Sequence, residues 1–147
     1  MNIQKIMFLK LRFVMSFIFL WAFFDKVFGL GFATGQENAW INGGSPTYGF
    51  LTHAVRGPLA PFFQSLAGMP IVDWSFMLGL LFVGLTLLFN RFVFLGSLSG
   101  IIMMILMWSA VFPPENNPII DDHIVYAIVL AILAVKSRDG ELKIKSQ

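Results

Sequence analysis

Residues 74–112 read WSFMLGLLFVGLTLLFNRFVFLGSLSGIIMMILMWSAVF, and this stretch decides the fold. It holds two apolar runs, 74–89 and 92–112, with only Asn90 and Arg91 between them. An apolar run of about 20 residues is long enough to cross the ~30 Å hydrocarbon core of a bilayer as a helix. A connection this short joins antiparallel neighbours. The stretch therefore predicts two adjacent membrane-spanning helices.

Two further apolar segments, about 6–30 and 118–135, flank this pair. Over the whole chain 57% of residues are apolar, 12% are charged and the mean hydropathy is +0.78, whereas soluble domains contain about 45–50% apolar and about 25% charged residues. We therefore expect an all-α integral membrane protein. Its single domain, residues 1–135, would be a four-transmembrane-helix bundle, followed by a polar cytoplasmic tail at 136–147.

The segment 31–73 is predicted to be a long outer loop. It is rich in glycine and proline, yet it also carries aromatic residues such as Trp40, which a flexible solvated linker would not need. Ser45, followed by proline, predicts a short helix through Ala54, and a second short helix is expected over 58–66. Neither piece can span a bilayer, so we expect an interfacial or re-entrant lid.

The ends of the longer helices carry sequence signals as well. Asp73 is expected to cap the second span, and Asn117, which is followed by proline, is expected to cap the fourth. Pro113 and Pro114 are expected to end the third span, because the residue before a proline disfavours helical geometry.

Lysine and arginine are distributed unevenly about the four predicted spans. Eight of the ten fall on one side of the predicted membrane: Lys5, Lys10, Arg12, Arg91, Lys136, Arg138, Lys143 and Lys145. The other side carries Lys26 and Arg56, with six of the eight acidic residues and both histidines. Cytoplasmic loops carry an excess of basic residues. We therefore expect a multi-pass protein of a prokaryotic plasma membrane, with both termini cytoplasmic and any chemistry on the outer face.

One stripe of the first predicted span combines aromatic rings with a carboxylate. Phe17, Trp21, Asp25 and Phe28 recur at helical spacing, and Lys26 is the next residue along from the carboxylate. Charges at that depth are costly unless they are paired or reach water. A role in ligand binding or proton handling is one interpretation. A charged pair that extends outward and fixes the helix end is the other.

Two smaller polar groups are also candidates for the outer face. His53 and Arg56 are three residues apart in the loop, so together they would clamp an anionic or carbonyl-bearing ligand. Alternatively, Arg56 pairs with a carboxylate such as Asp25 while His53 caps a turn.

The start of the fourth predicted span holds the most concentrated polar set, Asp121, Asp122, His123 and Tyr126. Asp122 and Tyr126 are four residues apart, and His123 and Tyr126 are three apart, so their side chains are expected to lie close together. Such a set would bind and protonate a polar headgroup, since a histidine beside carboxylates titrates near neutral pH. Alternatively, the two aspartates complement the helix dipole.

Small residues in the second and third predicted spans indicate close helix packing. The spacing of four recurs in Ser75 and Gly79 and again in Gly96 and Gly100. The packing would be either within the bundle or against a partner. The methionines at 103, 104 and 107 are expected to pack adaptably, or to line a pocket for a flexible apolar ligand.

The sequence limits the cofactors of the protein. Cysteine is absent, which excludes disulfides and thiolate chemistry. Because only two histidines are present, a zinc site of the usual ligands would need carboxylates or another subunit, and we predict no metal site. A haem between His53 and His123 is a minor alternative. The basic residues flank membrane segments, so nucleic acid is not an expected partner.

Four stretches of the chain are similar to the DoxX family and its DoxD-like relatives, which are small four-helix membrane proteins. They are FLWAFFDKVFGLGFAT, AWINGGSPTYGFLTHAVRGPLAPFFQSLAG, PIVDWSFMLGLLFVGLTLLF and MWSAVFPPENNPIIDDHIVYAIVLAILA. Together they extend over about residues 12–134. The positions that this resemblance singles out, without assigned roles, are Trp21, Asp25, Lys26, Arg56, Asp121, Asp122 and His123.

The resemblance implies a role beside quinone-linked redox enzymes, because the DoxD relative is the small membrane subunit of a thiosulfate:quinone oxidoreductase. The leading hypothesis is therefore a membrane subunit that binds a quinone or similar lipophilic ligand near the outer face, with Asp25, His53 and His123 near its polar head. The chain alone is expected to hold no redox cofactor. Besides the bilayer, a protein partner or a second copy of the chain is expected.

Two other classes of function compete with this hypothesis. One is a non-catalytic anchor or assembly subunit, whose Gly96 and Gly100 face would hold a larger complex together. The other is a small transporter or channel, which would need a polar path through the bilayer. The deep parts of the second and third predicted spans are interrupted only by serine, threonine and glycine, so the transporter ranks last.

Overall fold

Five α-helices form the framework of the computed structural model, which describes residues 3–144 and the side chains of residues 3–138. They are α1 (Ile3–Phe28), α2 (Ala60–Ser65), α3 (Pro70–Phe89), α4 (Val93–Ala110) and α5 (Asp122–Ile144). Short helical turns at Gln36–Asn38, Trp40–Asn42 and Phe50–Ala54 lie between α1 and α2. The described chain is thus all-helical, as the sequence predicts.

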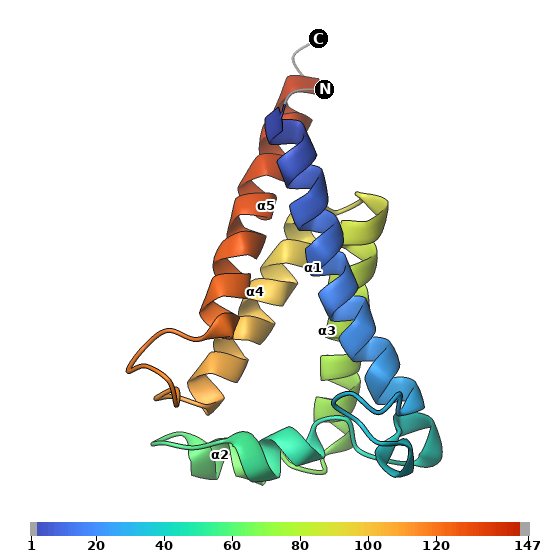
Figure 1. The fold of residues 1–147 in the computed structure, drawn as a ribbon, viewed down its shortest axis with the longest axis vertical. Helices are drawn as coiled ribbons and strands as arrows, with labels where there is room; N and C mark the ends of the chain where they lie inside the picture. Colours follow the sequence, from blue (N-terminus) through green and yellow to red (C-terminus); the bar gives the residue numbers. More distant parts are fainter. Residues whose placement is uncertain (1–2, 145–147) are drawn as a thin grey trace.

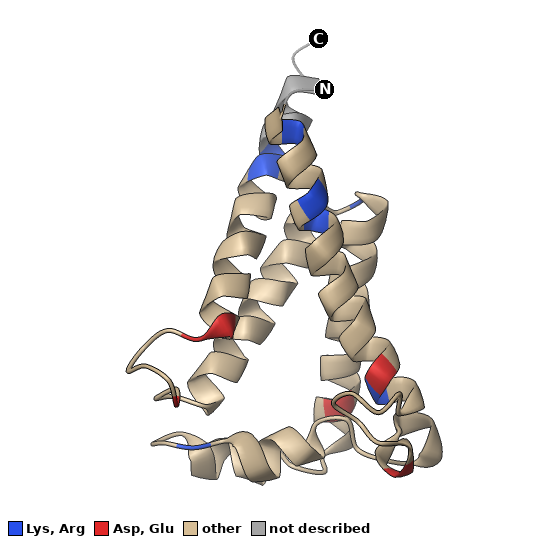
Figure 2. Cartoon of the chain, in the orientation of Figure 1, with Lys and Arg blue, Asp and Glu red and all other residues tan. Residues whose placement is uncertain are grey.

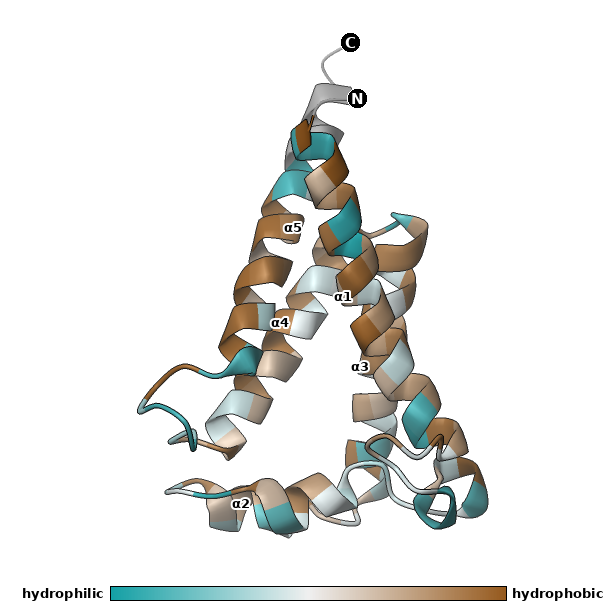
Figure 3. Cartoon of the chain, in the orientation of Figure 1, coloured by the Kyte–Doolittle hydropathy of each residue, from teal (hydrophilic) through white to brown (hydrophobic). Residues whose placement is uncertain are grey.

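Three of these helices, α1, α3 and α4, are long and apolar enough to cross a membrane, judged by length and composition. The fold is therefore that of a multi-pass helical membrane protein. In Figure 3 apolar residues dominate all four long helices, and polar residues gather at the narrow end and in the connecting segments. The fourth predicted span, in α5, does not meet the same criterion, because its apolar run ends at Val135 and is followed by Lys136 and Arg138.

The long helices form two pairs that diverge. In Figure 1, α1 runs beside α3 and α5 runs beside α4, and the two pairs draw together toward the end where both termini lie. At the opposite, wider end, α2 and its flanking segments lie across the opening. Contacts between α1 and α5 are few compared with those within each pair. Figure 2 shows lysine and arginine mostly toward the narrow end and acidic residues toward the wide end.

The turn between α3 and α4 is as tight as the sequence predicts. Asn90 ends α3 in the left-handed conformation, with φ of 55°. The backbone amide of Arg91 donates to the Thr86 carbonyl. Asparagine tolerates this conformation better than most residues. The prediction of two antiparallel neighbours is confirmed.

Small residues allow the helices to pack closely. The Ser16 hydroxyl of α1 donates to the Gly84 carbonyl of α3 at 2.8 Å. A Cβ added at Gly96 would collide with Thr86 of α3, and one at Gly100 would lie 2.7 Å from Leu130 of α5. Both glycines of the predicted packing face therefore contact helices of the same chain. Gly79 likewise lies against Met103 of α4.

Three predicted helix ends were wrong. The short helix predicted from Ser45 through Ala54 is present as a helical segment over 48–54, so it begins later than predicted. Asp73 lies inside α3, which begins at Pro70. Helix α5 begins at Asp122 and not at Asn117. The Asn117 Oδ1 instead accepts the backbone amides of Ile119 at 2.8 Å and Ile120 at 2.7 Å. An asparagine that bonds its own following amides favours a turn over a helix.

Helix α5 extends beyond Val135, where the fourth span was predicted to end. Helix α5 continues through Ile144, so most of the predicted polar tail at 136–147 is helical, and residues 145–147 lie outside the described part. Polar residues such as Lys136 and Arg138 end the apolar stretch, but they do not end the helix, because lysine and arginine are good helix formers. The chain therefore leaves its apolar region at Val135 without leaving the helix.

We expect Gly96→Ala to lower the stability of the protein by about 1–3 kcal/mol, because the added methyl group overpacks the contact with Thr86. Thermal unfolding in detergent, followed by circular dichroism, measures this. Gly49→Ala is the control, since Gly49 has ordinary helical geometry and open space around a Cβ. Equal melting temperatures of the two variants would contradict the close packing of α3 and α4.

Candidate ligand-binding site

The loop segment at residues 45–66, which we call the strap, crosses the wide end and is anchored at two points. The first anchor is the Asp73 carboxylate in the first turn of α3, which is 6% exposed. Its Oδ1 accepts the Ser45 hydroxyl at 2.9 Å, the Thr47 amide at 3.1 Å and the Thr47 hydroxyl at 2.6 Å. Hydrogen bonds to an ionised acceptor are the stronger kind. Asp73 thus fixes the start of the strap instead of capping its own helix.

The second anchor is Arg56, which joins the strap to the end of α4. Its backbone amide donates to the Ala110 carbonyl at 3.0 Å, and its Nε donates to the Val111 carbonyl at 3.1 Å. Its Nη1 lies 2.8 Å from the Glu115 carboxylate. A cation at a helix C-terminus also complements the helix dipole. The alternative that Arg56 pairs with a carboxylate is confirmed, with Glu115 as the partner in place of the suggested Asp25.

The position after Arg56 requires a glycine. Gly57 has φ of +73°, and a Cβ there would collide with the carbonyl of Phe112. Behind this contact, Leu51, Val55 and Phe63 pack with Ala110 in a small apolar cluster. The strap is therefore attached to α4 by hydrogen bonds and by packing.

A cavity of about 430 Å³ lies beneath the strap, between the strap, α1, α3 and α4. Its walls are mostly apolar, and include Phe50 and Phe63 of the strap, Phe76 of α3, and Met103 and Met107 of α4. This agrees with the expectation that the methionines suit a pocket. Methionine and aromatic side chains adapt to irregular apolar ligands.

Lys26 is the charged residue of this cavity. Thr47 and Ser75 also line it, but their hydroxyls already donate to Asp73 and to the Ile71 carbonyl. The Lys26 ammonium lies 5.9 Å from the centre of the Phe76 ring. Across the described residues it has neither a hydrogen-bond acceptor nor a carboxylate in salt-bridge range. A half-buried ammonium with spare donors in an apolar cavity is suited to bind an oxygen acceptor.

The neighbouring Asp25 has a structural role instead. It is 1% exposed, and its two oxygens accept the backbone amides of Phe32 at 3.2 Å and Ala33 at 2.9 Å. These bonds hold the chain where it turns back after α1. Trp21 lies on the outer side of α1, stacked on Phe17 and edge-on to Phe32, and it borders an open apolar groove, not the cavity. Phe17 and Trp21 therefore border the open groove, whereas Lys26 lines the cavity beneath the strap.

Neither histidine lines the cavity. His53 is exposed on the strap, where its Nδ1 lies 2.7 Å from the Thr52 hydroxyl and 3.2 Å from the Gly49 carbonyl. This arrangement matches the alternative that His53 caps a turn. His53 and Arg56 do not form a clamp, because the Arg56 side chain is turned to Val111 and Glu115.

The polar set at the start of α5 is brought together only in part. Asp121 accepts the Ile124 amide at 3.3 Å, and its Oδ2 lies 2.7 Å from His123 Nδ1, whereas Asp122 is 3.7 Å from that nitrogen. Tyr126 packs on the bundle core, and among the described residues its hydroxyl bonds to none of the three. The donor atoms of Asp121, Asp122 and His123 lie within 4.8 Å of one another. They are able to approach a cation, but they face no cavity in common with Lys26.

Sequence reasoning identified Lys26 and the methionines Met103 and Met107, but not that they share one cavity. Ser75 was predicted to pack between helices, and it instead lines the cavity on an exposed position of α3. Phe50 and Phe63 are among the loop aromatics that distinguish this segment from a flexible linker, but their place in a cavity was not predicted. Phe76 lies in α3 and was not singled out.

Comparison with protein-family models, with curated proteins and with solved structures found no match. The fold and the cavity therefore define the class: a small multi-pass helical membrane protein with an apolar, lysine-bearing cavity beneath a tethered loop. The resemblance to the DoxX family stays a prediction.

We expect Asp73→Ala to release the strap, because the variant loses an acceptor shared by three donors. Trypsin cutting after Arg56 reports this release, and we expect it to be at least tenfold faster in the variant. Asp122→Ala is the control, since that side chain is 71% exposed at the same end of the molecule. Unchanged cleavage in Asp73→Ala would show that Arg56 alone holds the strap.

Proposed function

We propose that this protein is a DoxX-like membrane subunit of a quinone-linked oxidoreductase system, which binds a quinone or a similar lipophilic ligand in the cavity beneath the strap. The observation that supports this best is an apolar cavity of about 430 Å³ that contains one half-buried ammonium with free donors. Ligand pockets are typically about 300–1,000 Å³, largely apolar, with a few placed polar groups.

The chemistry of the cavity suits a quinone ring. The apolar side chains of Phe76, Met103 and Met107 would contact the ring and its tail, and the Lys26 ammonium would donate to one carbonyl oxygen. A bound carbonyl would in turn give the ammonium the acceptor that the described residues do not supply. Electrons would come from a redox partner, so the part of this chain is to bind, orient and shield the ligand.

The level of the cavity relative to the bilayer supports the same proposal. Asp73 and Asn90 are 17 residues apart on α3, which is roughly 25 Å at about 1.5 Å per residue and close to the ~30 Å hydrocarbon thickness. The cavity lies beside Asp73, near one interface. A quinone with a long tail would therefore reach it from within the membrane.

We propose that α5 is a fourth span, although its uncharged run is short. It packs along α4, whose length and composition suit a span. The Trp108 indole of α4 donates to the Ile119 carbonyl just before α5 at 2.7 Å. The end of α4 and the start of α5 therefore lie close together, at about the same depth. Lys136 would reach the opposite interface by extending its side chain. Both termini would then be cytoplasmic in a prokaryotic plasma membrane by the positive-inside rule.

The alternative is a non-catalytic anchor or assembly subunit. Gly96 and Gly100, the face first expected to hold partners, pack inside this chain. An assembly would have to use another surface, and the exposed aromatic face of α1, which includes Phe13, Phe17 and Phe24, is the candidate. In this alternative the cavity would be dispensable.

We expect Lys26→Met to lower quinone retention at least tenfold when the full chain is purified in lipid nanodiscs with ubiquinone or menaquinone and the bound quinone is quantified by mass spectrometry. Leu106→Trp, which places a larger side chain at the cavity wall, should act similarly. Lys10→Met is the control, because Lys10 is an exposed lysine at the other end of α1.

Two results would count against this proposal. Equal quinone retention by the wild type, Lys26→Met and Leu106→Trp would remove the cavity from ligand binding. Loss of a co-purifying protein partner on changing Phe17 and Phe24 to alanine, with no quinone bound to any variant, would favour the anchor.

A further inference from the structure

A second cavity lies at the narrow end of the molecule, far from the strap. It measures about 470 Å³ and is lined by three cations, Lys5 and Arg12 of α1 and Lys136 of α5. Asn90 of the α3–α4 turn and Ser137 supply polar groups, and the remaining lining is apolar. No carboxylate borders it among the side chains at 3–138. The cavity is therefore positively charged on an apolar base.

Among the side chains of residues 3–138, no carboxylate lies in salt-bridge range of the cations of this cavity. Arg12 is half-buried, and its Nε is buried with no hydrogen-bond partner within the described residues. Arg12 lies 5.4 Å from the centre of the Phe13 ring, and Lys136 lies 5.3 Å from that of Phe8. Rings stabilise cations, but they do not compensate the repulsion between like charges. A buried guanidinium donor without an acceptor is suited to a ligand that brings an anionic oxygen.

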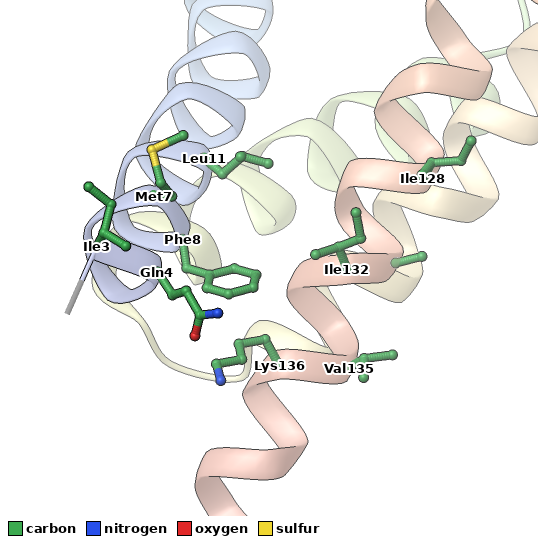
Figure 4. A pocket seen from close by; sticks show the side chains of 10 residues that line it. Ile3, Gln4, Met7, Phe8, Leu11, Ile128, Ile132, Val135 and Lys136 are labelled. Carbon is green, nitrogen blue, oxygen red and sulfur yellow. The ribbon is translucent and has the colours of Figure 1, made fainter.

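An apolar crevice adjoins this cavity. It runs between α1 and α5, measures about 850 Å³ and is bordered by Leu11, Ile128 and Ile132, among others. Phe8 and Lys136 border both hollows. Figure 4 shows the two side chains projecting between the helices, with Leu11, Ile128 and Ile132 further along the opening. A charged hollow thus continues into an apolar one.

We propose that these two hollows together bind one anionic phospholipid. The phosphate would be held by Arg12, Lys5 and Lys136, and an acyl chain would fill the crevice between α1 and α5. The guanidinium fork matches a phosphate with two parallel hydrogen bonds. Basic pockets between membrane helices on the cytoplasmic side bind anionic headgroups in this way. The site is separate from the strap cavity and does not depend on what that cavity binds.

The proposed lipid would also join parts of the fold that scarcely touch. α3 and α4 pack closely, but α1 and α5 make few contacts with each other, so the crevice leaves one side of the boundary between the two helix pairs open. A lipid with its phosphate on Arg12 and Lys136 bridges the two pairs at the narrow end. We therefore expect anionic lipid to stabilise the fold as well as to bind.

The experiment is native mass spectrometry of the full chain with phosphatidylglycerol or phosphatidylcholine, together with the melting temperature in nanodiscs of each lipid. The wild type should retain phosphatidylglycerol at least tenfold better than phosphatidylcholine and should melt at a higher temperature in it. Arg12→Gln and Lys136→Gln should each remove this preference. Ala131→Trp, which fills the crevice but keeps every cation, should weaken retention of both lipids.

Arg91→Gln is the matched control, because Arg91 is an exposed cation at the same end that does not line the cavity. It should keep the preference for phosphatidylglycerol. If Arg91→Gln lost the preference for phosphatidylglycerol to the same extent, the preference would come from general charge attraction and not from a defined site, and the proposal would be overturned. Displacement of the lipid by millimolar inorganic phosphate, or full retention in Ala131→Trp, would also overturn it, because the site would then recognise an anion without its chain.

Discussion

The structure depends on one carboxylate, that of Asp73, which connects the long loop to the membrane-spanning framework. A single oxygen accepts three donors from Ser45 and Thr47, and the side chain is almost fully buried. Buried ionised groups are tolerated only when such bonds compensate for lost water. Because Asp73 lies in the first turn of α3, it orients the strap, and the strap in turn forms one wall of the Lys26 cavity.

The helices are held together by close packing of complementary surfaces more than by burial of apolar surface. In a bilayer, lipid tails are as apolar as leucine, so helices associate through close packing and a few hydrogen bonds. Ser16 with Gly84, Thr86 with Gly96, and Leu130 with Gly100 are such contacts. They join α1 to α3, α3 to α4 and α4 to α5, in that order. Among the side chains described, α1 and α5 share no such small-residue contact, and their boundary is the more open side of the bundle.

Local signals predicted the framework well and the site poorly. Apolar length and the Asn90–Arg91 turn were enough to predict α3, α4 and their adjacency, because both are properties of neighbouring residues. Long-range partners were not predictable in this way. Asp73 looked like a helix cap because aspartate often is one, and only the folded loop shows that its donors are Ser45 and Thr47. Lys26 was singled out for its depth in an apolar helix, while Asp25 beside it proved to be structural.

The two anchors of the strap lie on different helices, Thr47 on α3 through Asp73 and Arg56 on the end of α4. The interval of eight residues between them, 48–55, thus sets a fixed span across the wide end of the molecule. Its length, more than the identity of its residues, limits how far the outer ends of α3 and α4 can separate. One residue more or fewer in this interval would change the width of the cavity beneath the strap while keeping the same wall residues.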